Sequence, residues 1–181
     1  MRVLGVDPGS RVCGYGVLES RHGELTHIES GGIVPGGSLL FPQRLKAIYE
    51  GLREVIVRSA PDAISIEQVF IAKNAKSALK LGEARGVGLL AAAVSGIPVH
   101  EYTPTEIKLA LTGQGRASKI AVKEIVSLIL GIPEWKRSDV TDAVAIALCH
   151  IYLSETKARL GVEVMRPRRR RRRWTEDDFS S

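Results

Sequence analysis

Residues 1–10 read MRVLGVDPGS, a short apolar run that ends in an acidic residue, a proline and two small residues. Val3, Leu4 and Val6 have the apolar character of a buried strand, and Asp7 follows them directly. A carboxylate at the end of a buried strand loses hydration, so it needs a metal ion, a cation or backbone donors as a partner. The alternative is that Asp7 only starts a turn, because Asp-Pro and Pro-Gly both favour turns.

The rest of the chain has the pattern of an α/β domain. Besides the first run, strands are predicted at 11–20, 24–34, 62–69 and 97–102. Helices are predicted at 41–61, 74–95, 103–113, 117–131 and from Ser138 onward. The three early strands indicate hairpins, and the later alternation of helix and strand indicates strands parallel to the first. We therefore expect one domain with a mixed five-stranded sheet flanked by helices.

Composition indicates a single globular domain. The 181 residues suffice for a substantial core, and 44% hydrophobic and 25% charged residues are ordinary for a globular protein. No apolar stretch reaches the length of a membrane span, and the run before Asp7 is too short for a signal peptide core. Cys13 and Cys149 lie far apart among apolar neighbours, which predicts buried, unpaired thiols. These features predict a cytoplasmic protein.

The net charge of +6 is divided between the body of the chain and a basic C-terminus. Residues 161–181 contain seven arginines and four acidic residues, so they carry +3, and six of these arginines are consecutive. Because adjacent arginines cannot pack together, we expect a folded domain over 1–157 and a solvated, disordered basic tail over 158–181. The tail is either a nonspecific contact for a polyanion or a solubilising extension, and both interpretations fit the sequence.

Four acidic residues occupy positions that such a fold brings towards one edge of the sheet. Asp7 ends the first strand and Glu67 ends the fourth, and ligands gather at the carboxyl ends of strands in sheets of this kind. Asp139 and Asp142, at i and i+3, share one face of the last helix. Acids in the first turn of a helix are also common without any function, because the helix dipole favours them. The combination of all four predicts a shared site.

Clustered carboxylates repel one another, and a bound cation relieves the repulsion. Hard oxygen ligands suit Mg²⁺ or Mn²⁺, whereas the chain has no Cys/His spacing typical of zinc sites. Two such ions can activate a water molecule and stabilise the leaving oxygen of a phosphodiester. A basic protein with an acidic cluster therefore indicates a metal-dependent nuclease.

Residues near these acids are suited to DNA. Phe70, beyond the fourth strand, is either a core residue or, if exposed, a platform for an unpaired base. Lys73 follows it, and a glycine-containing loop carries Arg116 and Lys119, whose side chains can contact phosphates. Each of these cations taken alone is also consistent with a solvated surface charge.

The predicted helix at 74–95 is rich in small residues. Gly82, Gly86 and Gly88 lower its helix propensity by roughly 1 kcal/mol each. Small residues spaced by four let another backbone approach closely. This helix therefore packs tightly either inside the monomer or across a dimer interface.

Four motifs resemble the bacterial RuvC family of Holliday junction resolvases. They are GVDPGSRVCGYGV (5–17), IEQVFIAKNAKSALKLGEARGV (66–87), GQGRASK (113–119) and SDVTDAVAIALCH (138–150). The resemblance runs in order over about residues 1–155, and the long second block is highly specific. It implies a ribonuclease H-like fold, a homodimer and a four-way DNA junction as substrate.

The resemblance also implies roles for individual residues. Asp7, Glu67, Asp139 and Asp142 match the metal-binding acids; some members carry His at the third of these positions, where this chain has Asp139. Phe70 matches an aromatic residue that stacks at the opened junction centre. Lys108 and Lys119 match basic residues that act near the scissile phosphate, so Lys119 is also a candidate catalytic residue.

The activity implied is hydrolysis of two symmetrically placed phosphodiesters, one by each subunit, leaving a 5′-phosphate and a 3′-hydroxyl. Two Mg²⁺ ions per subunit would serve it, with Mn²⁺ as a substitute. Proteins similar to RuvC work with the RuvA–RuvB branch-migration complex. The basic tail is not part of the family pattern.

Two other functions fit parts of the sequence. The segment DPGSRVCGYGV also resembles the first phosphate loop of actin-like ATPases and sugar kinases, but those proteins need a second similar half, for which 181 residues leave no room. A catalytically inactive junction-binding protein is the other alternative, although all four acids are present.

Overall fold

A computed structural model describes residues 1–68, 75–135 and 137–161. Its elements in chain order are β1 (Arg2–Asp7), β2 (Cys13–Arg21), β3 (Glu24–Ile33), α1 (Phe41–Ser59), β4 (Ala63–Glu67), α2 (Ala75–Val94), β5 (Val99–Tyr102), α3 (Pro104–Thr112), α4 (Lys119–Leu130) and α5 (Ser138–Arg159). Every predicted strand and helix forms, with small differences at the ends. For example, α1 stops at Ser59 because Ala60 adopts the left-handed conformation with φ of 43°.

The strands form one mixed sheet in the order β3-β2-β1-β4-β5. β1 is antiparallel to β2 and β2 to β3, whereas β1 is parallel to β4 and β4 to β5. The predicted mixed five-stranded α/β fold is therefore confirmed. Within the described ranges, no helix is both long and apolar enough to cross a membrane.

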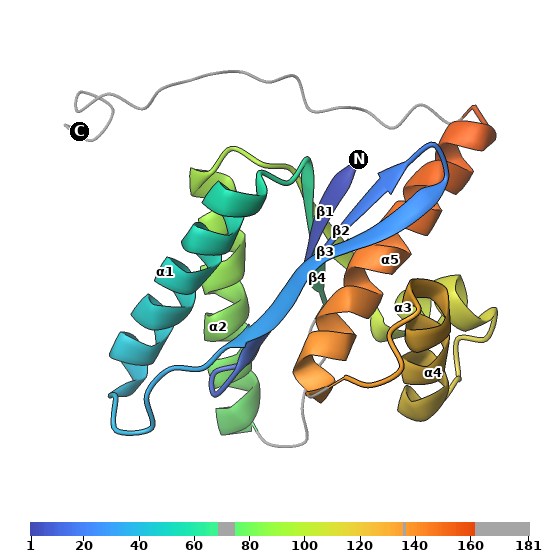
Figure 1. The fold of residues 1–181 in the computed structure, drawn as a ribbon. Helices are drawn as coiled ribbons and strands as arrows, with labels where there is room; N and C mark the ends of the chain where they lie inside the picture. The colour runs from blue at the N-terminus through green and yellow to red at the C-terminus, as the bar shows by residue number, and fades with distance from the viewer. Residues whose placement is uncertain (69–74, 136, 162–181) are drawn as a thin grey trace.

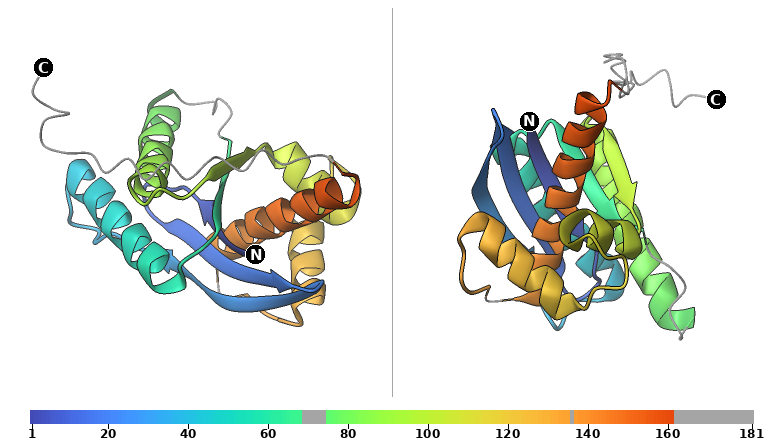
Figure 2. Two further views of the ribbon diagram at one scale, coloured as in Figure 1. Left: turned by 90° about the horizontal axis from the view of Figure 1, so that it is seen from above. Right: turned by 90° about the vertical axis from the view of Figure 1, so that its right-hand side faces the viewer.

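Helices cover both faces of the sheet (Figures 1 and 2). α1 and α2 lie on one face, and α3, α4 and α5 lie on the other. The middle of β1, residues 3–6, is buried on both sides: Val3 belongs to the core beneath α5, and Leu4 and Val6 belong to the core beneath α1 and α2. Cys13 and Cys149 are both buried and unpaired, as the sequence predicts.

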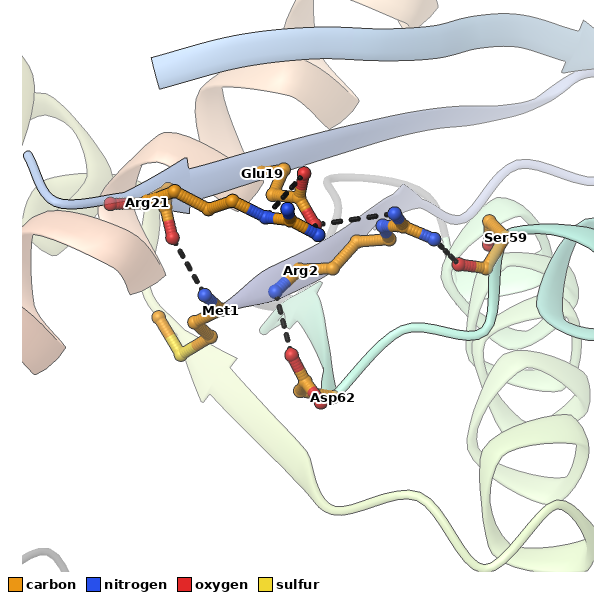
Figure 3. Close-up of polar contacts among 7 residues, drawn as sticks. Met1, Arg2, Glu19, Arg21, Ser59 and Asp62 are labelled. Carbon is orange, nitrogen blue, oxygen red and sulfur yellow. Dashed lines mark hydrogen bonds and ion pairs between the residues drawn. The ribbon is translucent and has the colours of Figure 1, made fainter. Parts of the chain in front are cut away.

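The start of β1 is held by a polar network at the opposite end of the strand from its terminal carboxylate (Figure 3). The Met1 amino group donates to the Ser20 carbonyl oxygen at 2.6 Å, and the Arg2 amide donates to Asp62 Oδ2 at 2.8 Å. The Arg2 guanidinium donates through Nη1 to the Ser59 carbonyl oxygen at 2.5 Å. These contacts join β1 to β2, to the segment before β4 and to the end of α1.

A second polar contact joins β5 to α5. The Tyr102 hydroxyl and Nδ1 of His150 are hydrogen-bonded at 2.7 Å, and only 3% of His150 is exposed. Burial, followed by the neighbouring His100 and Lys157, lowers the pKa of His150 to about 4, so the ring is neutral near pH 7. Because Tyr102 is the register partner of Glu67, this contact links the end of β4 to α5.

α5 approaches the sheet so closely that two strand positions admit only glycine. A Cβ atom on Gly5 would overlap the backbone oxygen of Ala143 and lie 2.8 Å from the Ala147 nitrogen. A Cβ atom on Gly14 would overlap the backbone oxygen of Asp139. The first turns of α5 therefore lie directly on the backbone of β1 and β2.

We expect Gly14→Ala to lower the free energy of unfolding by about 2 kcal/mol or more, because the added methyl group overlaps the helix backbone at Asp139, which cannot move without shifting α5. Urea denaturation measures this change. Gly37→Ala is the matched control, since a Cβ atom there meets nothing within 4 Å, and we expect its midpoint to stay close to that of the unmodified protein. Equal midpoints for Gly14→Ala and the unmodified protein would show that α5 does not need this close approach.

Candidate active site

Two of the candidate acids lie at neighbouring strand ends. β1 and β4 are parallel with Val6 opposite Ile66, so Asp7 and Glu67, which follow these residues, end at the same edge of the sheet. Both side chains are half-buried. A strand buried on both faces leaves these carboxylates only partly hydrated, as the sequence indicates.

The other two acids come from the start of α5. Asp139 and Asp142 lie one helical turn apart, and about a third of each side chain is exposed. The backbone contact between α5 and Gly14 brings Asp139 to this edge, because Gly14 is the register partner of Asp7 on β2. Sheet and helix therefore present their acids on the same side of the molecule.

Electrostatics at Asp7 reflects this convergence. Burial, followed by the negative charges of Asp142, Glu67 and Asp139, raises the pKa of Asp7 to about 8, and Lys119 opposes the rise. Burial and then Asp142 also raise the pKa of Glu67, while Lys119 and Lys108 lower it. The structure thus places the other three predicted acids within electrostatic reach of Asp7.

Basic side chains surround the acids. Lys119 Nζ lies 3.2 Å from Asp142 Oδ2, and Asp142 is the main cause of the raised pKa of this lysine. Lys108, on α3, is close enough to Glu67 to affect its pKa. Arg116 is exposed in the loop between α3 and α4, and no ion pair joins it to the acids among the described residues.

Arg137 is a neighbour that the sequence interpretation missed. Its Nη2 lies 3.3 Å from Asp139 Oδ2, and its guanidinium lies beside Gly32 of β3. The only sequence signal was its position two residues before Asp139 in the segment KRSD. Phe70 and Lys73, the remaining predicted DNA contacts, lie outside the described residues.

The chemistry of the donor set fits Mg²⁺ or Mn²⁺, because all four acids offer hard carboxylate oxygens. In the described part of the chain, however, no group of three or more His, Cys, Asp or Glu side chains is already arranged to hold a metal ion. Asp139 and Asp142 instead point to Arg137 and Lys119. The carboxylates of the four acids would therefore have to turn towards a shared cation.

Comparison with known proteins identifies a family. The family model for crossover junction endodeoxyribonuclease RuvC matches residues 3–150. The chain is similar to RuvC of Trichlorobacter lovleyi, with 46% identity over 169 residues that cover 93% of this chain and 95% of that protein. It is also similar to RuvC of Geobacter sulfurreducens, with 48% identity over 150 residues that cover 83% and 92% of the two chains.

Solved structures agree with the sequence comparison. Thermus thermophilus RuvC in complex with Holliday junction substrate is 34% identical and matches with a TM-score of 0.81 over 90% of this chain and 97% of that one. The yeast mitochondrial Holliday junction resolvase Ydc2 is 12% identical, matches with a TM-score of 0.62 and covers 87% of this chain and 82% of its own. At that low identity the second match shows a shared fold alone.

Asp7→Asn should stabilise the fold, because the neutral amide removes the repulsion between the half-buried Asp7 carboxylate and the three other acids. The pKa of Asp7 in the folded protein is about 8, above its ordinary value of 3.8. The protonated carboxyl therefore contributes its full stabilisation of the fold below pH 3.8, and this contribution is lost as the pH rises through 8. The gain from asparagine is therefore largest above pH 8, where we expect roughly 2–4 kcal/mol in EDTA.

Urea denaturation at pH 5 and pH 8.5 measures this gain, with Glu24→Gln on β3 as the control for removing an exposed acid. A variant that is less stable than the unmodified protein at pH 8.5 would contradict the crowding of charge at Asp7. Addition of Mg²⁺ should raise the melting temperature of the unmodified protein more than that of Asp7→Asn.

Proposed function

The chain belongs to the RuvC family of crossover junction endodeoxyribonucleases, and we propose that it resolves four-way DNA junctions by cutting two opposed strands symmetrically. The observation that carries this proposal is the convergence of four carboxylates at one edge of the sheet, which follows from the register of β1 with β4 and from the contact of α5 with Gly14. The raised pKa of Asp7 agrees with it. Such a cluster is costly for the fold and has a direct use in phosphodiester hydrolysis.

The four acids are assigned as ligands for two Mg²⁺ ions in each subunit, with Mn²⁺ as a substitute. When bound, such ions activate a water molecule and stabilise the leaving oxygen of a phosphodiester. The support comes from the donor oxygens of Asp7, Glu67, Asp139 and Asp142 and from their mutual repulsion. The products would carry a 5′-phosphate and a 3′-hydroxyl, so that the nicks can be ligated.

Basic residues at the rim are assigned to the DNA backbone. Lys119 suits this role because 83% of its side chain is exposed while its ammonium group stays at the acids, next to the position of a scissile phosphate. Lys108 lies near Glu67, and Arg116 extends the positive rim along the loop before α4. Phe70 is assigned to stacking at the junction centre and Lys73 to a phosphate contact, both from the family resemblance.

A homodimer is proposed through α2. Gly82 and Gly86 face open space, since a Cβ atom on either would meet nothing within 4 Å. Leu79, Leu90 and Val94 share this side of the helix and are exposed. Of the three glycines, Gly88 faces the core of its own subunit, together with the buried alanines Ala84, Ala91 and Ala92.

The nuclease domain is proposed to span 1–157, with a separate basic tail over 158–181. The family model ends at residue 150, and α5 continues to Arg159, so the proposed boundary falls in the last turn of α5. We further propose that the protein acts on DNA in the cytoplasm together with the RuvA–RuvB branch-migration complex. The support for DNA and for the RuvA–RuvB complex as partners is family membership.

The decisive experiment incubates the protein with a synthetic four-way junction and with a linear duplex of matched sequence, each in Mg²⁺ and in EDTA. We expect paired symmetric nicks in the junction alone, only with the metal ion, and products that DNA ligase can seal. Asp7→Asn should bind the junction without cutting it. Binding without cleavage by the unmodified protein, in Mg²⁺ or Mn²⁺ and over varied junction sequences, would mean that the protein is a junction-binding module.

The dimer is tested by Gly86→Leu. Removing a glycine from a helix should stabilise the monomer by about 0.8 kcal/mol, while the leucine side chain should block close approach of the second α2. Sedimentation velocity should therefore show a folded monomer. The control is Lys123→Leu, which places the same side chain on the exposed face of α4 and should leave the dimer intact; a dimer in both variants would rule out this seam.

A further inference from the structure

The turn between β3 and α1 presents apolar side chains to solvent. We call residues 34–40 the leucine turn. Val34 is 57% exposed, Leu39 37% and Leu40 71%. The turn is held by local hydrogen bonds, from the Leu39 amide to the Gly36 oxygen at 3.1 Å and from the Leu40 amide to Gln43 Oε1 at 2.9 Å. Single exposed leucines are ordinary, whereas here three exposed apolar side chains lie within seven consecutive residues.

Leu40 also occupies a position where leucine is unfavourable. It is the N-cap of α1, with φ of −64° and ψ of 155°, and makes no side-chain hydrogen bond to the helix. Ser, Thr, Asp or Asn at this position would accept a hydrogen bond from the first turn. Residues that break a local rule in this way concentrate at functional sites.

The leucine turn leaves the sheet at the same edge as the acids. Gly14 of β2 is the register partner of Asp7 on β1 and of Gly32 on β3. The end of β3 therefore lies in line with Asp7 across the sheet, two strands away. α1 begins at the same end of the molecule as α2 and α5 (Figure 1). The turn therefore lies beside the catalytic edge, on the face covered by α1 and α2.

Charge around the turn favours a polyanion. The first turn of α1 contains no acidic residue, so the positive end of its dipole is uncompensated. Lys80 of α2 lies over the Phe41 ring, with its Nζ 5.6 Å from the ring centroid. A second copy of the chain would bring the same positive charges to this surface, whereas DNA brings phosphates together with apolar base faces.

We infer that the leucine turn contacts unstacked bases at the crossover of the four-way junction. The inference rests on the proposed function but uses residues outside the acidic cluster and outside the segment that carries Phe70. The apolar side chains would cover base surface that opening of the crossover exposes to water, while Lys80 and the start of α1 face the adjoining phosphates.

Leu40→Ser separates this role from a structural one. Serine removes the apolar contact but supplies the missing N-cap acceptor, so the folding equilibrium constant should rise roughly threefold. Junction affinity in EDTA should fall roughly fivefold, with affinity for linear duplex unchanged. The fluorescence of 2-aminopurine placed at the crossover, which reports base unstacking, should rise less on binding of the variant than of the unmodified protein.

Leu128→Ser is the matched control, because Leu128 is 79% exposed on α4. Equal junction affinity and fluorescence for both variants and the unmodified protein would overturn the inference. Dissociation of Leu40→Ser into monomers in sedimentation would also overturn it, since the turn would then be a subunit contact. Cleavage by the unmodified protein in the same preparation separates the two claims: if it cuts the junction and Leu40→Ser behaves identically, only this inference fails.

Discussion

The backbone of α5 lies directly on the backbone of β1 and β2, and the candidate active site depends on this contact. Two of the four acids come from strand ends and two from the helix, so their separation is set by how closely the two layers pack. Gly5 and Gly14 remove the side chains that would hold the layers apart. Since Gly14 pairs with Asp7 and touches Asp139, one residue joins the strand acid to the helix acid.

The same close packing creates an electrostatic cost that the chain offsets only in part. The charges of Glu67, Asp139 and Asp142 disfavour ionisation of Asp7, and the limited hydration of this site strengthens the effect. Lys119 and Arg137 neutralise two of the acids through partly exposed ion pairs, which are weak and easily exchanged. The acids are therefore kept close together at a cost to stability, as expected where function and stability conflict.

The topology explains why so many candidate DNA contacts gather at one edge. β1 and β4 are parallel, so their carboxyl ends lie at the same edge of the sheet. The helices that come after β3 and β4 in the chain, α1 and α2, begin at this edge too. The start of α1, the start of α2 and the start of α5 consequently lie at the end of the molecule that carries the acids. The exposed glycines of α2, Gly82 and Gly86, face away from the core.

Much of this protein follows from local sequence. The apolar run before Asp7, the Thr103–Pro104 start of α3 and the Gly113 and Gly131 helix ends are readable because neighbours along the chain determine them. Tertiary structure alone decided that α5 touches Gly14, that Arg137 pairs with Asp139, that Lys108 lies near Glu67 and that Leu40 stays exposed. Apart from the Arg137–Asp139 pair, whose members are two residues apart, those features depend on strand register and layer packing between segments distant in the chain, and local propensity contains no information about either.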